Sequence, residues 1–122
     1  LLFGKLGKVP FFGLPGNPVS SYVTFILFVI IAINKLSNRK TNFKYEKAVL
    51  LNKISKTSKR EAFFRGQLKV INNKLHVRTL EDQDSSLLYN LSLSDCLINI
   101  KADQYKIKEG ALVSIIKLPD LY

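Results

Sequence analysis

Residues 9–34 carry no charged side chain, and this uncharged stretch constrains the fold more than any other feature of the sequence. Its first half contains three prolines and two glycines, which predict a turn after a short buried strand at residues 9–13. Residues 19–36 are then apolar on nearly every side, with Asn17 placed to act as N-cap and Pro18 at the first helical position. Such a helix has to be enclosed by other elements, so we expect a buried core helix.

A membrane span is the alternative to a core helix. The densest apolar part, residues 22–33, is only twelve residues long, whereas a span needs about 20. We therefore favour a helix in a soluble protein without a membrane partner, and a membrane-anchored chain stays open as the third choice. The first eighteen residues cannot enclose this helix, and the chain begins with Leu1 instead of Met. Both observations lead us to expect a segment of a longer protein.

Beyond a polar linker at residues 37–42, the apolar pattern changes to a period near two. Asn72 and Asn73 predict a tight hairpin turn, because Asn tolerates positive φ. Five short strands predict a small β-barrel or sandwich. We assign them to residues 47–54, 62–71, 74–80, 97–100 and 112–117, and residues 85–94 receive no assignment.

The net charge of +10, from nineteen basic and nine acidic residues, raises the question of a polyanionic partner. Residues 35–60 carry nine basic residues against Glu46 alone. However, fifteen of the nineteen basic residues are Lys in a chain also rich in Asn and Ile, and no aromatic residues alternate with them as on single-strand stacking platforms. We favour a solvated basic face and expect no nucleic acid. A non-enzymatic basic β-barrel that binds RNA or an acidic partner is the alternative function.

Cys96 is the single cysteine of the chain, which limits the kinds of site that cysteine could form here. It cannot form an internal disulfide or a cysteine-rich metal cage, and no secretory signal pattern opens the chain. We expect a cytoplasmic protein. His76 has no Cys or second His nearby, and the acidic residues are scattered, so we assign neither a metal site nor a catalytic residue within this chain.

The strongest local signal is the loop Leu14-Pro15-Gly16-Asn17-Pro18-Val19-Ser20, between the predicted strand and helix. The N–H groups of a first helical turn have no partner inside the helix and meet the positive end of its dipole, which suits a phosphate or another oxyanion. Gly16 would let a ligand approach the backbone, and the hydroxyls of Ser20 and Ser21 would add donors. A tight turn with a well-capped helix, which needs no ligand, is the alternative.

Two further signals lie in the second half of the chain. Phe64-Arg65-Gly66 places an arginine in an otherwise apolar strand, where its guanidinium could present several donors to an anion. Strand arginines usually face solvent, so this signal is weak by itself. Gln83-Asp84-Ser85-Ser86 is polar and typical of a loop.

These motifs resemble the molybdopterin molybdenumtransferase family, known as MoeA and, in animals, as the gephyrin E domain. The resemblance runs through nearly the whole chain in the same order and spacing. It rests on Phe3-Gly4-Lys5-Leu6, Gly13-Leu14-Pro15-Gly16-Asn17-Pro18-Val19-Ser20, Val23-Thr24-Phe25, Leu27-Phe28-Val29, Phe64-Arg65-Gly66, Gln83-Asp84-Ser85 and Asp95-Cys96-Leu97-Ile98.

The resemblance implies a transferase of molybdenum cofactor biosynthesis. Family members take adenylylated molybdopterin and molybdate, use a divalent cation such as Mg²⁺, hydrolyse the adenylate and insert the metal into the dithiolene. The implied fold is mixed. Residues 1–40 would be the terminal strand and helix of an α/β molybdopterin-binding domain, and residues 41–122 the C-terminal β-barrel, domain IV. The full-length family is homodimeric and holds its Mg²⁺ ligands upstream, so this chain alone is expected to be inactive.

The resemblance also implies roles for particular residues. Arg65 falls on the Arg of the family's Phe-x-Arg-Gly strand and Ser85 on the Ser of its Gln-Gly-Ser turn, both of which are associated with molybdate. The family's Pro-Gly-Asn-Pro-Val-Ser loop, beside the cleft for molybdopterin and its adenylate, maps onto Pro15, Gly16, Asn17, Pro18 and Ser20.

The sequence departs from the family pattern in three places. Asp84 replaces the Gly between Gln and Ser, which puts a negative charge beside the expected molybdate site. Ile30 and Ile31 stand where the family usually has a polar residue and Pro. The family's carboxylates and lysines upstream of Phe3 are not in the sequence. Together with the start of the chain, these changes would suit a truncated or decaying gene.

Overall fold

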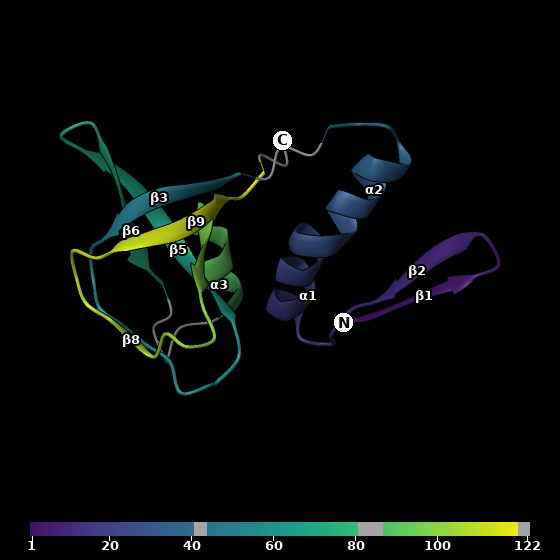
Figure 1. Ribbon diagram of the computed structural model, residues 1–122, viewed down its shortest axis with the longest axis horizontal. Helices are drawn as coiled ribbons and strands as arrows, with labels where there is room; N and C mark the ends of the chain where they lie inside the picture. The colour runs from purple at the N-terminus through teal and green to yellow at the C-terminus, as the bar shows by residue number, and fades with distance from the viewer. Residues whose placement is uncertain (41–43, 81–86, 120–122) are drawn as a thin grey trace. The chain divides into compact units, whose positions relative to one another are not determined.

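The computed structural model describes residues 1–40, 44–80 and 87–119 (Figure 1). The chain forms two compact units, Leu1–Asn42 and Phe43–Tyr122, which are called unit 1 and unit 2 below. Unit 1 contains a β-hairpin and a long helical run, and unit 2 contains a β-barrel with one short helix. The mixed fold class predicted from the sequence is therefore confirmed.

Unit 1 opens with a hairpin that the sequence patterns predicted only in part. β2 (Val9–Gly13) matches the predicted strand, and it pairs antiparallel with β1 (Leu2–Leu6), which we had not assigned. The turn between them contains Gly7 at φ 61°, a left-handed conformation that costs glycine little. Phe3 and Phe12 are partners in the register, and their ring centroids lie 5.0 Å apart.

The predicted helix is present as one continuous run that contains three elements. α1 (Pro18–Thr24) leads into a π-helical turn, η1 (Phe25–Val29), and then into α2 (Ile30–Leu36). The N-cap prediction is confirmed, because the Asn17 side chain accepts hydrogen bonds from the backbone N–H of Val19 at 3.0 Å and of Ser20 at 3.2 Å.

In the described residues this helix is mostly half-buried or exposed, and its burial by further elements of a larger domain stays a prediction. Ile26 is the one apolar residue of the described part of unit 1 that is buried, and side chains such as Phe28 remain half-exposed. The run Pro18–Leu36 has 19 residues and a mean hydropathy of 1.9, so by length and composition it could cross a membrane. Core helices and signal sequences pass the same test, and the criterion does not decide between these choices.

Unit 2 confirms the predicted barrel. Five strands close in the order β3-β6-β5-β7-β9, with the β3–β6 pair parallel and the other pairs antiparallel. Their bounds are β3 (Tyr45–Leu50), β5 (Ala62–Ile71), β6 (Lys74–Thr79), β7 (Cys96–Ile100) and β9 (Leu112–Lys117). The other elements are β4 (Ile54–Ser55), which pairs with β8 (Lys106–Ile107), and α3 (Leu87–Ser92).

Two local features show how side chains set the barrel's turns. Asn72 and Asn73 have φ of 50° and 60° and connect β5 to β6, as predicted. The strand predicted at residues 47–54 is instead divided between β3 and β4. Between them, the amide oxygen of Asn52 accepts the N–H of Thr79 at 2.9 Å, so this side chain takes the place of a backbone partner at the end of β6.

The interior of the barrel is apolar, and one face of each strand points into it. Gly66 leaves no room for a side chain, because a Cβ there would come within 2.7 Å of Val77 and 3.0 Å of both Cys96 and Ile98. The interior cluster consists of Ala48, Leu50, Ile54, Val77, Cys96, Ile98, Ile100, Ile107, Val113 and Ile115.

Candidate functional site in the barrel and the helix-start loop

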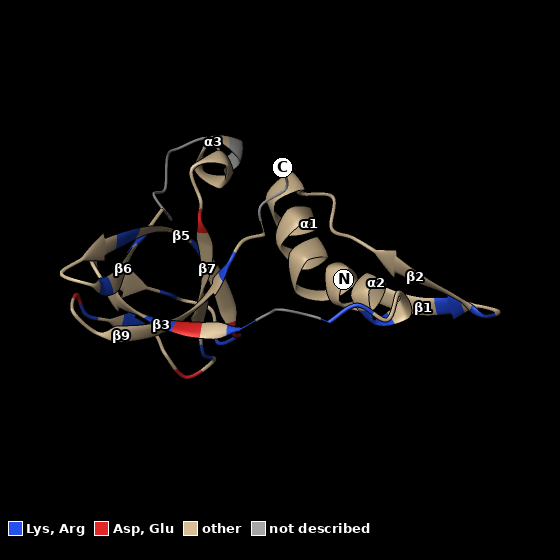
Figure 2. Cartoon of the chain, turned by 90° about the horizontal axis from the view of Figure 1, so that it is seen from above, with Lys and Arg blue, Asp and Glu red and all other residues tan. Residues whose placement is uncertain are grey.

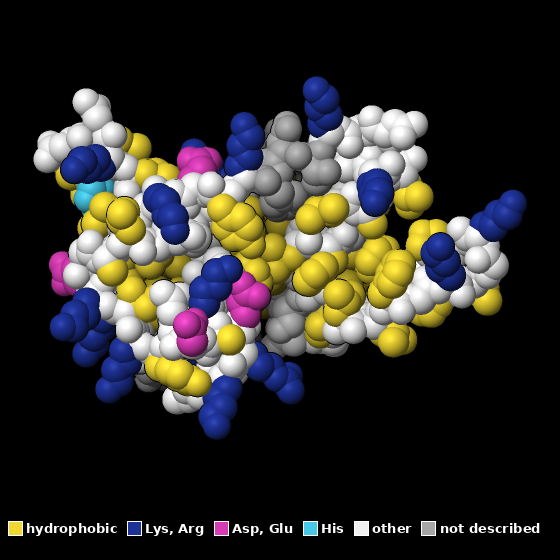
Figure 3. Space-filling model, in the orientation of Figure 1, with side chains coloured by type: hydrophobic (Ala, Val, Ile, Leu, Met, Phe, Trp, Pro, Cys, Tyr) yellow, Lys and Arg dark blue, Asp and Glu magenta, His cyan; other side chains and the backbone are white. Residues whose placement is uncertain are grey.

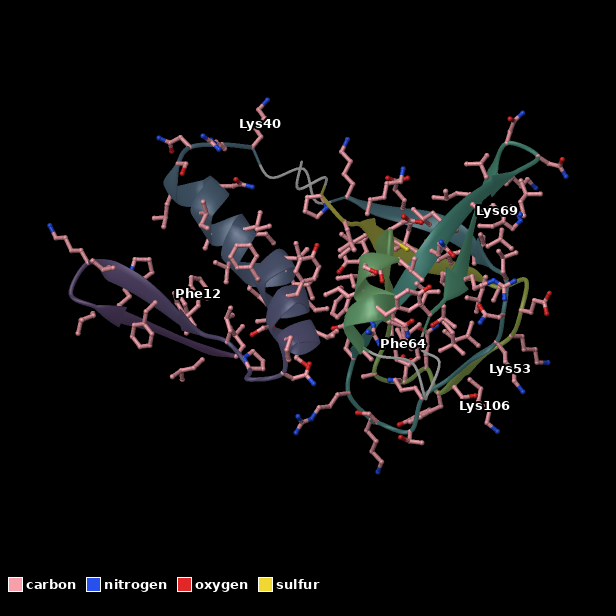
Figure 4. All side chains as sticks on the ribbon, turned by 180° about the vertical axis from the view of Figure 1, so that it is seen from behind. Phe12, Lys40, Lys53, Phe64, Lys69 and Lys106 are labelled. Carbon is pink, nitrogen blue, oxygen red and sulfur yellow. The ribbon has the colours of Figure 1, made fainter. Side chains whose placement is uncertain are left out.

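Arg65 is buried, with only 4% of its surface exposed, although strand arginines usually face solvent. Phe64 packs against the interior cluster and a Cβ at Gly66 would meet interior side chains, so alternation along β5 places the Arg65 side chain on the outer face. Figure 4 labels Phe64 on this strand. The solvent-facing interpretation of this arginine is therefore wrong.

Two apolar residues follow Arg65 across the outer face of the neighbouring strands. Arg65 is the register partner of Leu97 on β7, which is in turn the partner of Ile116 on β9. Leu97 and Ile116 are 0% and 4% exposed and lie outside the interior cluster. Charged hydrogen bonds are stronger in such a low-dielectric setting than at a solvated surface. A buried guanidinium here can therefore hold its bonding partner tightly.

A backbone hydrogen bond places Leu80, the last described residue before Gln83, Asp84 and Ser85, beside Arg65. The N–H of Leu80 donates to the Arg65 carbonyl at 2.9 Å, and the amide of Asn90 donates to the Leu80 carbonyl at 2.8 Å. Residues 81–86 themselves, Ser85 included, lie outside the described residues. The fold thus brings Leu80, fifteen positions further along the chain, to the backbone of Arg65.

Asp95 fastens the strands beside Arg65, a role that no sequence pattern indicated. Its carboxylate accepts the N–H of Leu68 at 2.8 Å, its N–H donates to the Gly66 carbonyl at 2.9 Å, and its carbonyl accepts the N–H of Leu118 at 2.9 Å. Burial, with a smaller contribution from the Asp95 charge, raises the pKa of the adjacent Cys96 thiol to about 12. A thiol with this pKa is protonated at neutral pH and is not a nucleophile.

The loop at the start of α1 offers fewer donors than the sequence suggested. The N–H groups of Val19 and Ser20 are taken by the Asn17 side chain, and that of Ser21 by the Asn17 carbonyl. The Ser21 hydroxyl donates to the Pro15 carbonyl, so it also has a partner. The first-turn amides that we expected to hold an oxyanion are therefore occupied by the cap.

Part of this loop remains open to a ligand. Ser20 is exposed, and a Cβ at Gly16 would meet no atom within 4 Å. Pro15 is half-buried, whereas Asn17 and Pro18 are exposed. The exposed hydroxyl of Ser20 beside the open space at Gly16 is the arrangement that could still bind a polar group.

Lys56 is a buried cation that the sequence did not reveal, within a region that we interpreted as a solvated basic face. It is 7% exposed, and its ammonium donates to the carbonyls of Arg60, Lys101 and Ala102 at 2.7, 2.8 and 3.3 Å. Its Nζ also lies 5.5 Å from the ring centroid of Tyr105. Its three donors all have carbonyl partners, so Lys56 holds two loops together and does not contribute to a solvated face.

Other lysines fit the solvated interpretation. Lys40, Lys53, Lys69 and Lys106 are all exposed, and their side chains are labelled in Figure 4.

Within the described part of the chain, no group of three or more His, Cys, Asp or Glu side chains could hold a metal ion. Nδ1 of His76 lies 2.9 Å from the carbonyl of Lys74 two residues away, a local contact. The described residues therefore do not fit a Mg²⁺ site.

Comparison with known families identifies the barrel. Residues 47–118 match the family model described as the MoeA C-terminal region (domain IV), which is more than half of the chain. The chain belongs to the MoeA family. The resemblance inferred from the ordered motifs is thereby confirmed.

Named relatives agree with this assignment. The chain is 34% identical over 117 residues to a molybdopterin molybdenumtransferase of Haemophilus influenzae, covering 93% of this chain and 29% of the relative. It is 38% identical over 95 residues to the molybdenum cofactor synthesis protein cinnamon of Drosophila melanogaster, covering 75% of this chain and 16% of the relative. The chain thus spans less than a third of the length of these curated relatives.

Solved structures support the fold. A molybdopterin biosynthesis MoeA protein from Pyrococcus horikoshii OT3 superposes with a TM-score of 0.71 at 26% identity, covering 84% of this chain and 26% of that one. A second structure of MoeA from the same species gives a TM-score of 0.76 at 22% identity over 94% of this chain and 28% of that one, a likeness of fold. Such coverage of this chain extends beyond unit 2 into unit 1.

Proposed function

We propose that the chain is the C-terminal part of a molybdopterin molybdenumtransferase, which inserts molybdate into adenylylated molybdopterin during cytoplasmic synthesis of the molybdenum cofactor. Unit 1 then corresponds to the terminal strand and helix of the molybdopterin-binding α/β domain, and unit 2 to domain IV. The observation that carries the proposal is the buried Arg65 of a MoeA barrel, connected through Leu80 to the segment of Ser85.

Arg65 is suited to the oxyanion of this reaction. Molybdate is a small tetrahedral dianion, and a guanidinium offers it a permanent charge and several N–H donors in a fixed plane. Leu80 bonds the backbone of Arg65 and accepts a hydrogen bond from Asn90, and we propose that the Ser85 hydroxyl supplies another donor to molybdate. Asp84, next to Ser85, opposes anion binding, so we expect a lower affinity than the family's Gly would allow.

For unit 1, we propose that the loop of Pro15, Gly16, Asn17, Pro18 and Ser20 contacts molybdopterin or its adenylate. The exposed Ser20 hydroxyl would make the hydrogen bond, and the open space at Gly16 would admit the ligand. Asn17 and Pro18 would act indirectly, because they fix the start of α1. Pro15 would hold the loop through its bond to Ser21.

Catalysis requires more than these residues. Mg²⁺, the divalent cation that we expect from the resemblance, needs oxygen ligands such as carboxylates, and the described residues supply no cluster of them. We therefore propose that this chain alone does not turn over, and that the complete enzyme is a homodimer. A molybdate-insertion assay that detected turnover by the 122-residue chain alone would contradict this part of the proposal.

The role of Arg65 can be tested by molybdate binding. In the 122-residue chain, Arg65→Ala should weaken molybdate binding at least about tenfold, because charge-assisted hydrogen bonds are worth about 1.5–3 kcal/mol. Arg65→Lys should lose part of the affinity, since it keeps the charge but not the planar group. Isothermal titration calorimetry with molybdate measures both.

The matched control is Arg78→Ala, which removes an exposed arginine from the neighbouring strand β6 and should change affinity less than about twofold. Circular dichroism should show an intact barrel for each variant. Equal losses for the Arg65 and Arg78 variants would mean that molybdate responds only to net charge, and the assigned role would be rejected.

A further inference from the structure

The hairpin of β5 and β6 extends past β7, the strand on the other side of β5. β7 pairs with β5 only from Ala62 to Gly66, whereas β6 pairs with β5 from Gly66 to Ile71. Figure 1 and Figure 3 show the tip of this hairpin projecting from the barrel. Within the described part of the chain, β5 therefore has no strand on that side between Gln67 and Ile71, and we call this side the free edge.

Printed hydrogen bonds show which backbone groups of β5 face the free edge. On that side, the Gly66 carbonyl accepts the N–H of Asp95 at 2.9 Å, and the Leu68 N–H donates to the Asp95 carboxylate at 2.8 Å. Backbone groups alternate in direction along a strand, so those of Val70 face the same side as those of Gly66 and Leu68. Among the described residues, no hydrogen bond occupies the Leu68 carbonyl or the Val70 N–H and carbonyl. Three backbone groups are thus available along the free edge.

An exposed strand edge of this kind can pair with an added strand. In strand addition, an extended peptide forms main-chain hydrogen bonds with the edge, and its alternate side chains give specificity. Val70, in the middle of the free edge, is 68% exposed, so an apolar side chain of the peptide can pack beside it. The free edge therefore offers backbone partners together with one apolar contact.

The charges of the hairpin restrict the chemistry of the added strand. β5 and β6 contain Arg65, Lys69, Lys74 and Arg78 and no acidic residue. Figure 2 shows the same bias, with blue and no red segments on these two strands. Lys69 and Lys74 are exposed beside the free edge, where they repel a second copy of the same hairpin and attract carboxylates. The complementary partner is therefore an extended peptide with acidic side chains.

We propose that the free edge of β5 binds an extended acidic peptide segment by strand addition. The three open backbone groups supply the hydrogen bonds, and Lys69 and Lys74 select for acidic side chains. Arg65 lies in the part of β5 that pairs with β7, so this surface is separate from the candidate molybdate site. The proposal therefore goes beyond the transferase function and does not depend on it.

The test uses a short synthetic peptide in which Glu and Val alternate. Isothermal titration calorimetry with the 122-residue chain measures its affinity, and a peptide with Lys in place of Glu should bind at least about tenfold more weakly. Amide hydrogen exchange followed by NMR should show that the acidic peptide protects the Val70 N–H. An attachment through charge alone would leave this N–H unprotected.

Substitutions at Val70 test the backbone hydrogen bonds. Val70→Pro removes the N–H at the free edge and no bond between β5 and β6, and proline is tolerated at edge positions whose N–H faces solvent. It should weaken binding of the acidic peptide at least about tenfold, because the added strand loses a donor and meets the ring. Val70→Thr keeps the N–H and is the matched control, with an expected change below about twofold.

Charge reversals test the choice of an acidic partner. Lys69→Glu combined with Lys74→Glu should weaken binding of the acidic peptide at least about tenfold. Lys53→Glu combined with Lys106→Glu gives the same change of net charge at exposed sites near β4 and in β8, and its effect should stay below about threefold. These substitutions leave the backbone of β5 unchanged, so they test the proposal even if Val70→Pro prevents folding.

Four results would overturn the proposal. Two are the absence of binding by the acidic peptide and equal affinities of the Val70→Pro and Val70→Thr chains. The third is an equal effect of the two double charge reversals, which would mean that the peptide responds only to net charge. The fourth is a wild-type dimer in size-exclusion chromatography with light scattering that Val70→Pro converts to a monomer, which would assign the free edge to a second copy. Since molybdate binding is measured with Arg65 variants, the failure of either proposal is recognised separately.

Discussion

Unit 1 and unit 2 use their apolar residues in opposite ways. Unit 2 buries twelve of the thirteen apolar residues described as buried, and unit 1 buries Ile26 alone. In contrast, twelve of the eighteen large apolar residues described as exposed belong to unit 1, although it is about half the size of unit 2. The barrel closes on itself and encloses a core, whereas a hairpin and one helical run have no second layer to cover them. Hydrophobicity alone therefore does not produce a self-sufficient fold, because the elements must also be able to enclose one another.

The largest expected effect comes from separating the units. A polypeptide of residues 43–122 should keep a single cooperative urea transition and a dispersed amide NMR spectrum. Residues 1–42 alone should show neither, because a chain of about 40 residues without disulfides or metal rarely folds. If residues 43–122 were unfolded by themselves, closure of the barrel would not be sufficient for stability, and the proposed difference between the units would be wrong.

The buried cation Lys56 should be the next most sensitive position in unit 2. Lys56→Met fills similar space but leaves the carbonyls of Arg60, Lys101 and Ala102 without their ammonium partner. The free energy of unfolding should fall by about 2–4 kcal/mol. Lys53→Met removes an exposed lysine nearby and should change it by less than about 0.5 kcal/mol. Similar values for the two variants, measured by chemical denaturation, would mean that the Lys56 hydrogen bonds add no stability.

A pair of glycine substitutions compares the two units directly. Gly66→Ala inserts a methyl group against Val77, Cys96 and Ile98, and this overpacking should lower the free energy of unfolding by about 1–3 kcal/mol. Gly16→Ala adds the same methyl group where no atom lies within 4 Å, so its effect should stay below about 0.5 kcal/mol. Equal effects in thermal unfolding would show that the barrel interior can adjust around Gly66.

The smallest expected effect concerns acid stability. A hydrogen bond from Asn99 at 2.7 Å, aided by Lys101 at 3.5 Å, lowers the pKa of Glu61 below its usual 4.5, against a smaller opposing effect of burial. The Glu61 contribution to stability is therefore present above pH 4.5 and is lost as the pH falls through the folded-state pKa. Wild type should exceed Glu61→Gln in denaturant midpoint slightly at pH 7 and not at pH 3. An equal difference at both values would exclude a contribution from ionisation. Unit 1 has no acidic residue, so this carboxylate effect belongs to unit 2.

The elements of both units could be predicted largely from local patterns. Pro18 and Asn17 define the start of the helix because a missing N–H and a side-chain acceptor suit only that position. The period-two pattern gave β5 with its observed bounds, and Asn72-Asn73 gave its turn. β4, β8 and α3 were not predicted, because strands of two residues and a helix of six are too short to show a periodic pattern. The five-residue β1 was also not predicted.

The candidate site shows a similar division. The Phe64-Arg65-Gly66 motif and the loop of Pro15 to Ser20 were evident as residues, but their surroundings were not. The occupied amides beside Asn17, the buried Arg65 and the carbonyl partners of Lys56 all depend on contacts made by the folded chain. The segment of Ser85 lies outside the described residues, so its proposed role still rests on the resemblance and on its neighbours Leu80 and Asn90.

By itself, the sequence determined the mixed fold class, the helix start, the main barrel strands and the family, because these depend on local conformational preferences and on the order of motifs. Only the tertiary structure decided which charged side chains are buried and which apolar ones are left exposed. Lys56 looks like any other lysine in the sequence, and the motif that marks Arg65 does not reveal its burial, because burial of a charge depends on partners that are distant along the chain. The helix of unit 1 shows the converse: its sequence is apolar, but burial of its side chains depends on other elements that pack against it.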